Sequence, residues 1–263
     1  MPIQYILDSN CCEVHGISCC WIVPDGVKHV TFELWGGGGG GGNAGTNCNC
    51  CQSGGPGMGG AYARKSINVT PGDYYYVCAG SGGMTYQEGE FTGAPVNLCC
   101  NGISGGNSFV IGVGLTNFCA EGGCGGRSDF GINCYSYCGC MFYSSGTPGI
   151  SATSYGYDYH AHSNGGLMHL YADGGNPYTI KNWGGTGAGP GGGGAGHNHS
   201  GSYNCWGGKM GDNSWGKYVG FPEPMMHGRI PGGGGAGQHF QSGCNCNPGR
   251  SGPGAPGMVK ITY

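Results

Sequence analysis

Seven consecutive glycines, Gly36 to Gly42, constrain the fold of this chain more than any other feature of its sequence. Further glycine-dense blocks lie at residues 54–60, 184–196, 232–237 and 249–257. The chain has 65 glycines and 14 prolines among its 263 residues, far above the share found in ordinary proteins. Such a composition is typical of disorder, because glycine loses more backbone entropy on ordering than any other residue.

Aromatic residues and cysteines argue against disorder in this chain. The glycines are interspersed with 17 Tyr, 8 Phe, 5 Trp and 18 Cys. Disordered chains, by contrast, are poor in aromatic residues. Because glycine lacks a Cβ, extended threefold rods of the polyproline II type can pack side by side and form lateral hydrogen bonds. We therefore expect packed polyglycine II rods, with flexible linkers as the alternative. Prolines, whose fixed φ suits such rods, occur in the blocks at Pro190, Pro231, Pro253 and Pro256.

Alternating apolar and polar residues predict β-strands near both ends of the chain. Expected strands cover residues 27–35, 62–69, 73–80, 108–115 and 257–263, with Val259 and Ile261 on one face of the last. Pro24-Asp25-Gly26 and Pro71-Gly72-Asp73 have the residue types of tight turns. No segment has a helical pattern. We expect a mainly β fold with almost no helix, in which a β-sandwich framework accompanies extensive irregular and polyglycine II structure.

The domain organisation follows from these patterns. We expect residues 1–20 to be an N-terminal attachment segment rich in cysteine, and residues 21–263 to form a single glycine-rich domain with a variable, loop-rich insert at 134–218. The N-terminus lacks the pattern of a secretory signal. No apolar run approaches the roughly 20 residues that span a bilayer, so membrane insertion is not expected.

Charged residues are scarce, and this excludes one class of partner. The chain has 23 of them, and its net charge is -3. No cluster of Lys or Arg is available to neutralise phosphates, so nucleic acid is not an expected partner. A surface so poor in charge suits a subunit of an assembly, and we expect a homo-oligomer.

Three segments carry a resemblance to a known family. They are VPDGVKHVTFELWGGGGGGG (23–42), GGAYARKSINVTPGDYYYVCAGSGG (59–83) and GAPGMVKITY (254–263). In this order they resemble the glycine-rich β-sandwich and polyglycine module of bacteriophage tail-fibre, tail-tip and adhesin proteins. The middle of the chain, residues 84–247, has no matching motif. It resembles phage adhesins only in its general organisation, with packed polyglycine rods and variable loops for host recognition.

This resemblance implies a virion protein of the tail or virion surface that recognises the host cell. The implied partners are other tail or fibre proteins and a host cell-surface glycan or protein, and the implied assembly is a trimer. A self-assembling structural or decoration protein of a virion or extracellular fibre, with no receptor role, is the alternative.

Residues 134–218 are rich in aromatic side chains among Ser, Gly and Asn. This is the composition of antibody paratopes, where rigid rings supply contact area and small polar residues adapt. The alternative is that the rings fill the core between glycine rods. We expect the receptor-binding residues to include Tyr155, Tyr157, Tyr159, Trp183, Tyr203, Trp206 and Trp215.

Two His-x-His pairs are candidate metal ligands: His160 with His162, and His197 with His199. On an extended strand, residues i and i+2 point to the same side, so both imidazoles of a pair can reach one ion. The pairs resemble the iron-binding His-x-His motifs of trimeric phage fibre tips, which implies iron. The alternative is that they are polar loop residues, and in that case no cofactor is bound.

Many of the 18 cysteines occur as vicinal pairs or as pairs separated by one residue, and disulfides are the favoured interpretation. Spacings of one residue are unusual for a zinc knuckle, whereas cross-links stabilise a chain with a modest core. Buried thiols and a metal site remain alternatives. The candidates are Cys48, Cys50, Cys138, Cys140, Cys244 and Cys246.

Enzymatic activity is not expected. The 13 acidic residues are dispersed, and the glycine runs lack the strand-loop-helix context that a phosphate-binding loop requires.

Overall fold

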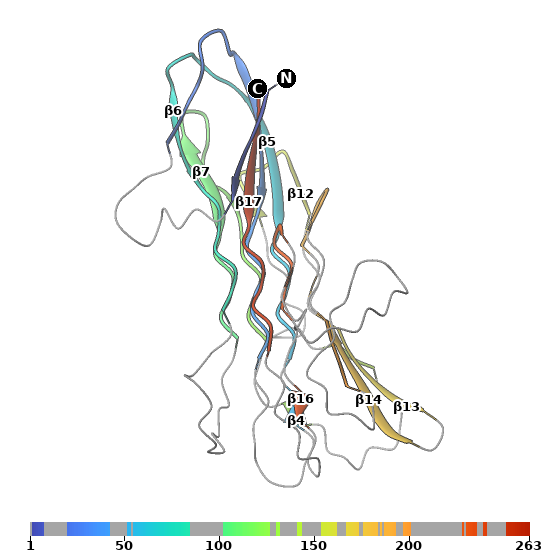
Figure 1. Ribbon diagram of the computed structural model, residues 1–263. Coiled ribbons are helices and arrows are strands. Elements are labelled where there is room, and N and C mark those ends of the chain that lie inside the picture. Colours follow the sequence, from blue (N-terminus) through green and yellow to red (C-terminus); the bar gives the residue numbers. More distant parts are fainter. Residues whose placement is uncertain are drawn as a thin grey trace.

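The computed structural model describes part of the chain, and all its regular elements there are β-strands (Figure 1). Nowhere in this part is a helix long and apolar enough to cross a membrane. The prediction of a mainly β fold is confirmed. The described residues are 2–7, 20–42, 52–53, 55–84, 102–126, 130–131, 141–143, 154–161, 167–173, 176–183, 185, 187–192, 197–200, 228, 230–235, 239–240 and 251–263.

Two five-stranded antiparallel sheets form a sandwich. The sheet centred on β3, here called the β3 sheet, has the order β1 (Ile3–Leu7), β17 (Met258–Thr262), β3 (His29–Trp35), β5 (Tyr62–Asn68) and β12 (Tyr159–Ala161). The sheet centred on β7, the β7 sheet, has the order β11 (Ser154–Tyr155), β8 (Phe118–Ala120), β7 (Ser108–Gly112), β6 (Tyr74–Cys78) and β2 (Cys20–Ile22). The expected framework of N- and C-terminal strands is therefore present.

The core lies between these sheets and follows from the alternation in the sequence. In β3, Phe32 and Leu34 are fully buried, and in β17 so are Val259 and Ile261, as predicted from their alternation. Trp21 of β2 packs edge-on against Phe32, with ring centroids 5.8 Å apart. Each such buried side chain contributes about 1.5–3 kcal/mol to folding.

The predicted turns are present at the tip of the sandwich. Gly26 has φ 81° and Gly72 has φ 91°, a left-handed conformation that residues with a Cβ adopt at a cost. The predicted strand at 108–115 ends at Gly112, because Leu115 donates its backbone N–H to the Gly112 carbonyl and closes a turn.

The seven-glycine segment continues from β3 and forms backbone hydrogen bonds in three directions. Every third N–H donates to the same neighbouring segment: residues 36, 39 and 42 to segment 55–61, residues 37 and 40 to segment 103–106, and residues 38 and 41 to segment 252–255. All three neighbours run antiparallel to it. A three-residue period is the period of a threefold extended helix, and polyglycine II remains our prediction for the conformation itself.

Three parallel neighbours complete the surroundings of this segment. They donate N–H groups to its carbonyls from Gly123 and Gly126, from Gly83 and from Gly235. Hydrogen bonds also join each neighbour to the next, so that six segments of alternating direction encircle residues 36–42. We call this arrangement the glycine bundle, and in order around its centre the six are 55–61, 121–126, 102–107, 80–84, 252–257 and 232–235.

The bundle explains where glycine is required. A Cβ on Gly39 would lie 2.1 Å from the carbonyl oxygen of Cys124, and every described glycine from 36 to 40 meets backbone in the same way. In four of the encircling segments, two residues with side chains lie three positions apart. These pairs are Ser81 and Met84, Ser104 and Asn107, Glu121 and Cys124, and Pro253 and Pro256.

Two smaller sheets complete the described structure. A four-stranded sheet has the order β10 (Met141–Tyr143), β13 (Leu167–Asp173), β14 (Asn176–Trp183) and β15 (His197–Ser200). A three-stranded sheet contains β16 (His239–Phe240), β4 (Gln52–Ser53) and β9 (Phe130–Gly131). Figure 1 shows the sandwich at one end, the glycine bundle below it, and β16 and β4 beyond the bundle.

Candidate recognition surface

One end of the glycine bundle faces away from the sandwich, and we call this end the distal pole. Several long segments join the bundle there. Gly42 donates to the carbonyl of Gly55 at 2.8 Å, and Ile103 donates to Met84 at 3.0 Å. The two ends of a segment thus lie side by side at this pole. The described residues that flank 43–54, 85–101 and 236–250 on both sides lie at this pole.

Described elements of these segments meet at the distal pole. The three-stranded sheet takes β4 from residues 43–54, β9 from the segment after Gly126, and β16 from residues 236–250. Loops that leave one end of a rigid scaffold are the usual place for binding residues. The pole is therefore suited to present variable sequence without disturbing the fold.

Four of the seven predicted receptor-binding residues are described by the structure, and these four fall in two places. Trp183 lies at the end of β14, where its backbone pairs with His197 of β15. Tyr155, Tyr157 and Tyr159 lie instead on the side of the sandwich, so the structure does not bring them together with the β14–β15 pair into one sheet. The remaining three, Tyr203, Trp206 and Trp215, lie outside the described residues.

The three tyrosines on the sandwich belong to residues 154–161, here called the bridging segment. Its first strand, β11, pairs with β8 of the β7 sheet, and its second, β12, pairs with β5 of the β3 sheet. The exposed fractions of Tyr155, Tyr157 and Tyr159 are 49%, 37% and 55%. The segment therefore closes one side of the sandwich and presents three rings to solvent.

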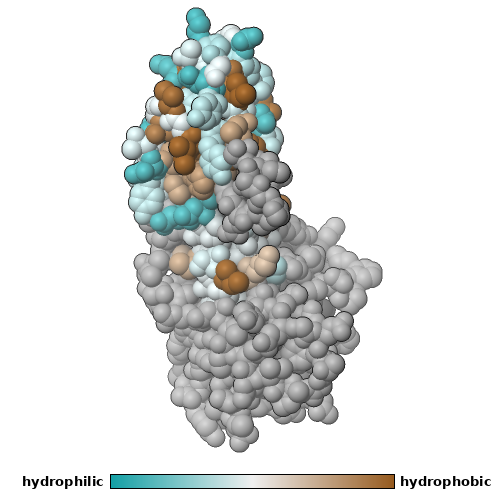
Figure 2. All heavy atoms as spheres, turned by 90° about the vertical axis from the view of Figure 1, so that its left-hand side faces the viewer, coloured by the Kyte–Doolittle hydropathy of each residue, from teal (hydrophilic) through white to brown (hydrophobic). Residues whose placement is uncertain are grey.

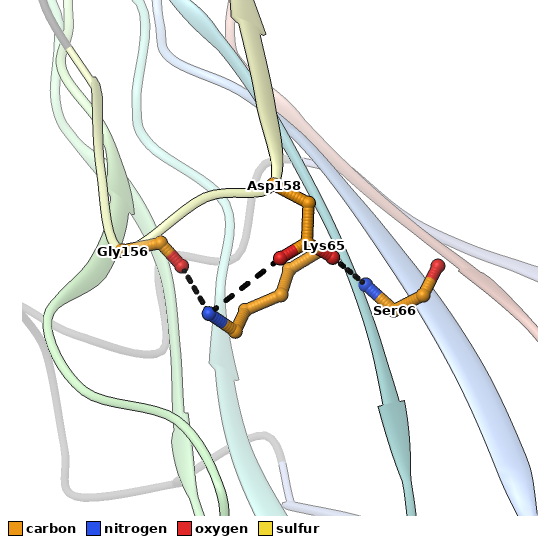
Figure 3. Close-up of polar contacts among 4 residues, drawn as sticks. All are labelled: Lys65, Ser66, Gly156 and Asp158. Atoms are coloured by element: carbon orange, nitrogen blue, oxygen red, sulfur yellow. Dashed lines mark hydrogen bonds and ion pairs between the residues drawn. The ribbon is translucent and has the colours of Figure 1, made fainter.

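Polar contacts fix the backbone of the bridging segment (Figure 3). Lys65 of β5 donates from Nζ to the carbonyl oxygen of Gly156 at 2.9 Å and lies 3.9 Å from Asp158 Oδ1. The backbone N–H of Ser66 donates to Asp158 Oδ2 at 2.9 Å. Ser154 donates from Oγ to the carbonyl oxygen of Tyr62 at 2.9 Å. The three tyrosines are thus carried on a backbone that polar contacts hold in place.

Ring contacts hold the tyrosine side chains. Tyr157 packs on the imidazole of His160 with ring centroids 4.0 Å apart. The Tyr157 hydroxyl also lies within hydrogen-bonding distance of His160 Nε2, at 3.5 Å. Tyr159 packs edge-on against Tyr62 at 6.0 Å. Tyr155 donates from its hydroxyl to Glu121 Oε1 at 3.0 Å.

A charged network lies beneath this surface, on the outer face of the β3 sheet. Glu33 accepts from Lys260 Nζ at 2.7 Å and from the Tyr62 hydroxyl at 2.7 Å. Burial opposes ionisation of Glu33, but the hydrogen bonds from Lys260 and Tyr62 outweigh it and lower the pKa of the carboxyl group. Burial, and then the Glu33 carboxylate, raise the pKa of Tyr62. At neutral pH the network is therefore an ionised carboxylate held by an ammonium and a phenol.

The histidine pairs remain candidates for a metal site. His197 and His199 both lie on strand β15, and their role as metal ligands remains a prediction. His160 lies on β12, and His162 lies outside the described residues. Among the residues that are described, no three His, Cys, Asp or Glu side chains come together as a metal-binding group. The strand placement alone does not distinguish a metal site from a polar surface.

The six cysteines predicted to form disulfides, Cys48, Cys50, Cys138, Cys140, Cys244 and Cys246, all lie outside the described residues. Within the described part, Cys78 at the end of β6 is disulfide-bonded, whereas Cys119 and Cys124 are thiols. Burial, with a smaller effect of Glu121, raises the pKa of the Cys119 thiol to about 11. Cys119 is therefore protonated and a poor nucleophile at neutral pH.

Several supporting residues escaped the sequence analysis. Lys65 and Asp158, which fix the bridging segment, are 93 residues apart and belong to no motif. The spacing of side chains within the glycine blocks was a usable signal, because Glu121-Gly-Gly-Cys124 and Ser81-Gly-Gly-Met84 follow the three-residue period of the bundle.

Comparison with known proteins identifies one similarity. The profile of a family described as a glycine-rich domain matches residues 14–263. No curated protein matches the chain.

Proposed function

Since the chain belongs to the family of glycine-rich domains, we propose that it is a structural recognition protein that binds its receptor through two sets of residues: the segments that join the bundle at the distal pole, and the aromatic-rich segment that follows β15. The sandwich and the glycine bundle act as the rigid support. The ligand is a glycan or protein on the surface of a host cell, and the function requires no catalytic step and no bound cofactor.

One observation carries this proposal: the described residues that flank 43–54, 85–101 and 236–250 all lie at the same end of the bundle. A scaffold that collects its insertions at one pole can vary them while its own contacts stay unchanged. Tyr203, Trp206 and Trp215, which we also expect to bind the receptor, follow β15 in the chain and belong to none of these three segments, so they form a separate candidate set.

The biological setting that we propose is the tail tip or surface of a bacteriophage virion. What supports it is the resemblance of segments 23–42, 59–83 and 254–263 to tail-fibre and adhesin modules. Other tail or fibre proteins would then anchor the chain in the virion. A self-assembling coat or decoration protein is the second candidate, and the low content of charged residues favours it equally.

Binding experiments with the full chain distinguish these two candidates. Labelled protein is applied to a glycan array and to a panel of bacterial cells. Recognition predicts saturable binding to at least one of them, and the double variant Trp206→Ala, Trp215→Ala should weaken it at least about tenfold, as expected for aromatic anchors. Tyr5→Ala is the control, because Tyr5 is an aromatic residue that is 56% exposed on β1 and is not among the predicted receptor-binding residues.

The bridging segment is tested in the same assay. A variant with Tyr157→Ala and Tyr159→Ala reports whether the side of the sandwich contributes to binding. If neither double variant changes the adsorption of a chain that does bind, both predicted sets of receptor residues are wrong. A chain that binds no cell or glycan but forms regular polymers would support the decoration protein instead.

A further inference from the structure

The two outer faces of the sandwich differ in chemistry. Figure 2 views the sandwich from the side of β6 and β7 and shows hydrophobic residues at its surface among hydrophilic ones. Ile111 is exposed on that side. The outer face of the β3 sheet instead carries charged and hydroxyl groups: Lys260 pairs with Glu33 at 2.7 Å, and Thr31 shares a hydrogen bond with Ser66 at 2.8 Å. This face therefore offers directional hydrogen-bonding groups.

Four side chains of this polar face lie next to one another in a row across four strands. Strand pairing sets Lys260 of β17 opposite Glu33 of β3, Glu33 opposite Arg64 of β5, and Arg64 opposite Tyr159 of β12. The residues on either side of Glu33 in β3 are fully buried in the core, so Glu33 and the residues paired with it face outward. Adjacent strands are about 4.8 Å apart, so the row, here called the Arg64 row, is continuous over roughly 14 Å.

The Arg64 row has an exposed cation that no described acid neutralises. Lys260 and Glu33 neutralise each other in their ion pair, and neither ion pair among the described residues involves Arg64. Arg64 is exposed, and its guanidinium presents several N–H donors in a planar fork. Next to it, Tyr159 is 55% exposed, and an edge-on contact with Tyr62 at 6.0 Å holds its ring. The row therefore carries one excess positive charge beside a fixed aromatic ring.

We propose that the Arg64 row binds an acidic saccharide, with a carboxylate of the sugar on the Arg64 guanidinium and a sugar ring against Tyr159. This inference rests on the proposed function, since the ligand is a host glycan, and it adds a site on the sandwich. A carboxylate matches the guanidinium fork in a bidentate pair. A tyrosine ring supplies a flat, amphipathic contact surface.

The position of the row within the sheet favours a saccharide over an acidic peptide. An extended peptide gains affinity by adding a strand to a free sheet edge. Arg64 lies on β5, which is paired with β3 on one side and with β12 on the other, so only side chains are available to a ligand here. Sugar hydroxyls can donate to the remaining lone pairs of Glu33 and accept from the remaining N–H groups of Lys260.

Binding of matched oligosaccharides to the full chain tests the proposal. The probes are one oligosaccharide that contains a uronic acid and one that ends in a sialic acid, each with its carboxyl-reduced, neutral counterpart. At least one acidic probe should bind at least about tenfold more tightly than its counterpart, because a charge-assisted bidentate pair is lost on reduction. The preference should weaken as salt is added.

Arginine variants assign the preference to the row. Arg64→Gln should abolish it, whereas Arg64→Lys should retain only part of it, because an ammonium keeps the charge but lacks the planar fork. Lys28→Gln is the matched control, since it removes the same charge from an exposed position outside the row. Thermal melting checks that each variant is folded.

Variants of Tyr159 test the aromatic contact. Tyr159→Phe keeps the ring and should bind like the wild type, whereas Tyr159→Ala should weaken the binding of the preferred acidic probe about tenfold, as expected for an aromatic anchor. Equal affinities of Tyr159→Ala and the wild type would contradict the placement of the sugar ring.

Several results would overturn the proposal. They are equal affinity for the acidic and neutral members of both pairs, an unchanged preference in folded Arg64→Gln, and an equal loss in Lys28→Gln. Binding of oligoglutamate that depends on Arg64, without binding of either acidic oligosaccharide, would show that the ligand is a peptide.

The variant Trp206→Ala, Trp215→Ala separates this inference from the proposed function. It should keep the preference for the acidic probe. A chain that binds cells through these tryptophans but shows no preference would leave the proposed function in place and overturn the role of the Arg64 row alone.

Discussion

A single Cβ is enough to disturb the centre of the glycine bundle. At Gly39 it would lie 2.1 Å from the carbonyl oxygen of Cys124, and this oxygen accepts the N–H of Met58. Neither backbone group can move away without losing its hydrogen bond. The demand is different at Gly72, where φ is 91° and a Cβ would meet nothing within 4 Å. Glycine is thus needed for space at one position and for backbone conformation at the other.

Gly39→Ala and Gly72→Ala separate these two effects. We expect Gly72→Ala to lower the free energy of unfolding by about 1–2 kcal/mol, the cost of a left-handed residue with a Cβ. Gly39→Ala should cost more than about 3 kcal/mol, because the clash is with backbone and spreads to several segments. Denaturant unfolding of both variants measures the difference. Equal losses would mean that the centre of the bundle can expand.

Glu33 should make the stability of the protein depend on pH in the acidic range. Its folded pKa lies below the ordinary value of 4.5, so the ionised form stabilises the fold, and this contribution is lost as the pH falls through the folded pKa. Glu33→Gln cannot ionise. We expect it to be about 1 kcal/mol less stable than the wild type above pH 4.5, with the difference shrinking below that pH. A difference that stays constant in acid would contradict the prediction.

At the scale of elements, the bridging segment links the two sheets through short strands and a few polar contacts. β11 and β12 have two and three residues, too few to be stable alone. Asp158 compensates by accepting the N–H of Ser66 and pairing with Lys65. The position of the three tyrosines therefore depends on side-chain contacts as well as on strand pairing.

Asp158→Ala tests this dependence. We expect a loss of about 1 kcal/mol in stability and faster amide hydrogen exchange across residues 154–161, because the segment opens locally. Asp25→Ala, in the exposed Pro24-Asp25-Gly26 turn, is the matched control and should leave exchange in the bridging segment unchanged. Unchanged exchange in Asp158→Ala as well would show that strand pairing alone fixes the segment.

At the scale of the whole molecule, the glycine bundle separates the sandwich from the distal pole. The bridging segment lies on the sandwich, whereas the described residues that flank 43–54, 85–101 and 236–250 lie at the distal pole. Sites on separate rigid parts with no shared contacts should respond independently to substitution.

The sequence by itself determined the β class, the strands at 29–35, 62–68, 74–78 and 258–262, and the glycine turns at Gly26 and Gly72. These features depend on alternation and on local backbone conformation, which neighbouring residues encode. Short elements such as β2 and β12 escaped prediction, because two or three residues carry no period and are strands only when a partner pairs with them.

Only the tertiary structure decided which glycine segment lies at the centre of the bundle and which six encircle it. Hydrogen bonds between segments far apart in the chain leave no local trace, because each segment offers the same N–H and carbonyl groups to any neighbour. The same reason applies to the candidate surfaces. The exposed rings of 155–159 and the Arg64 row depend on which side of a sheet is covered, and packing between distant strands determines that side.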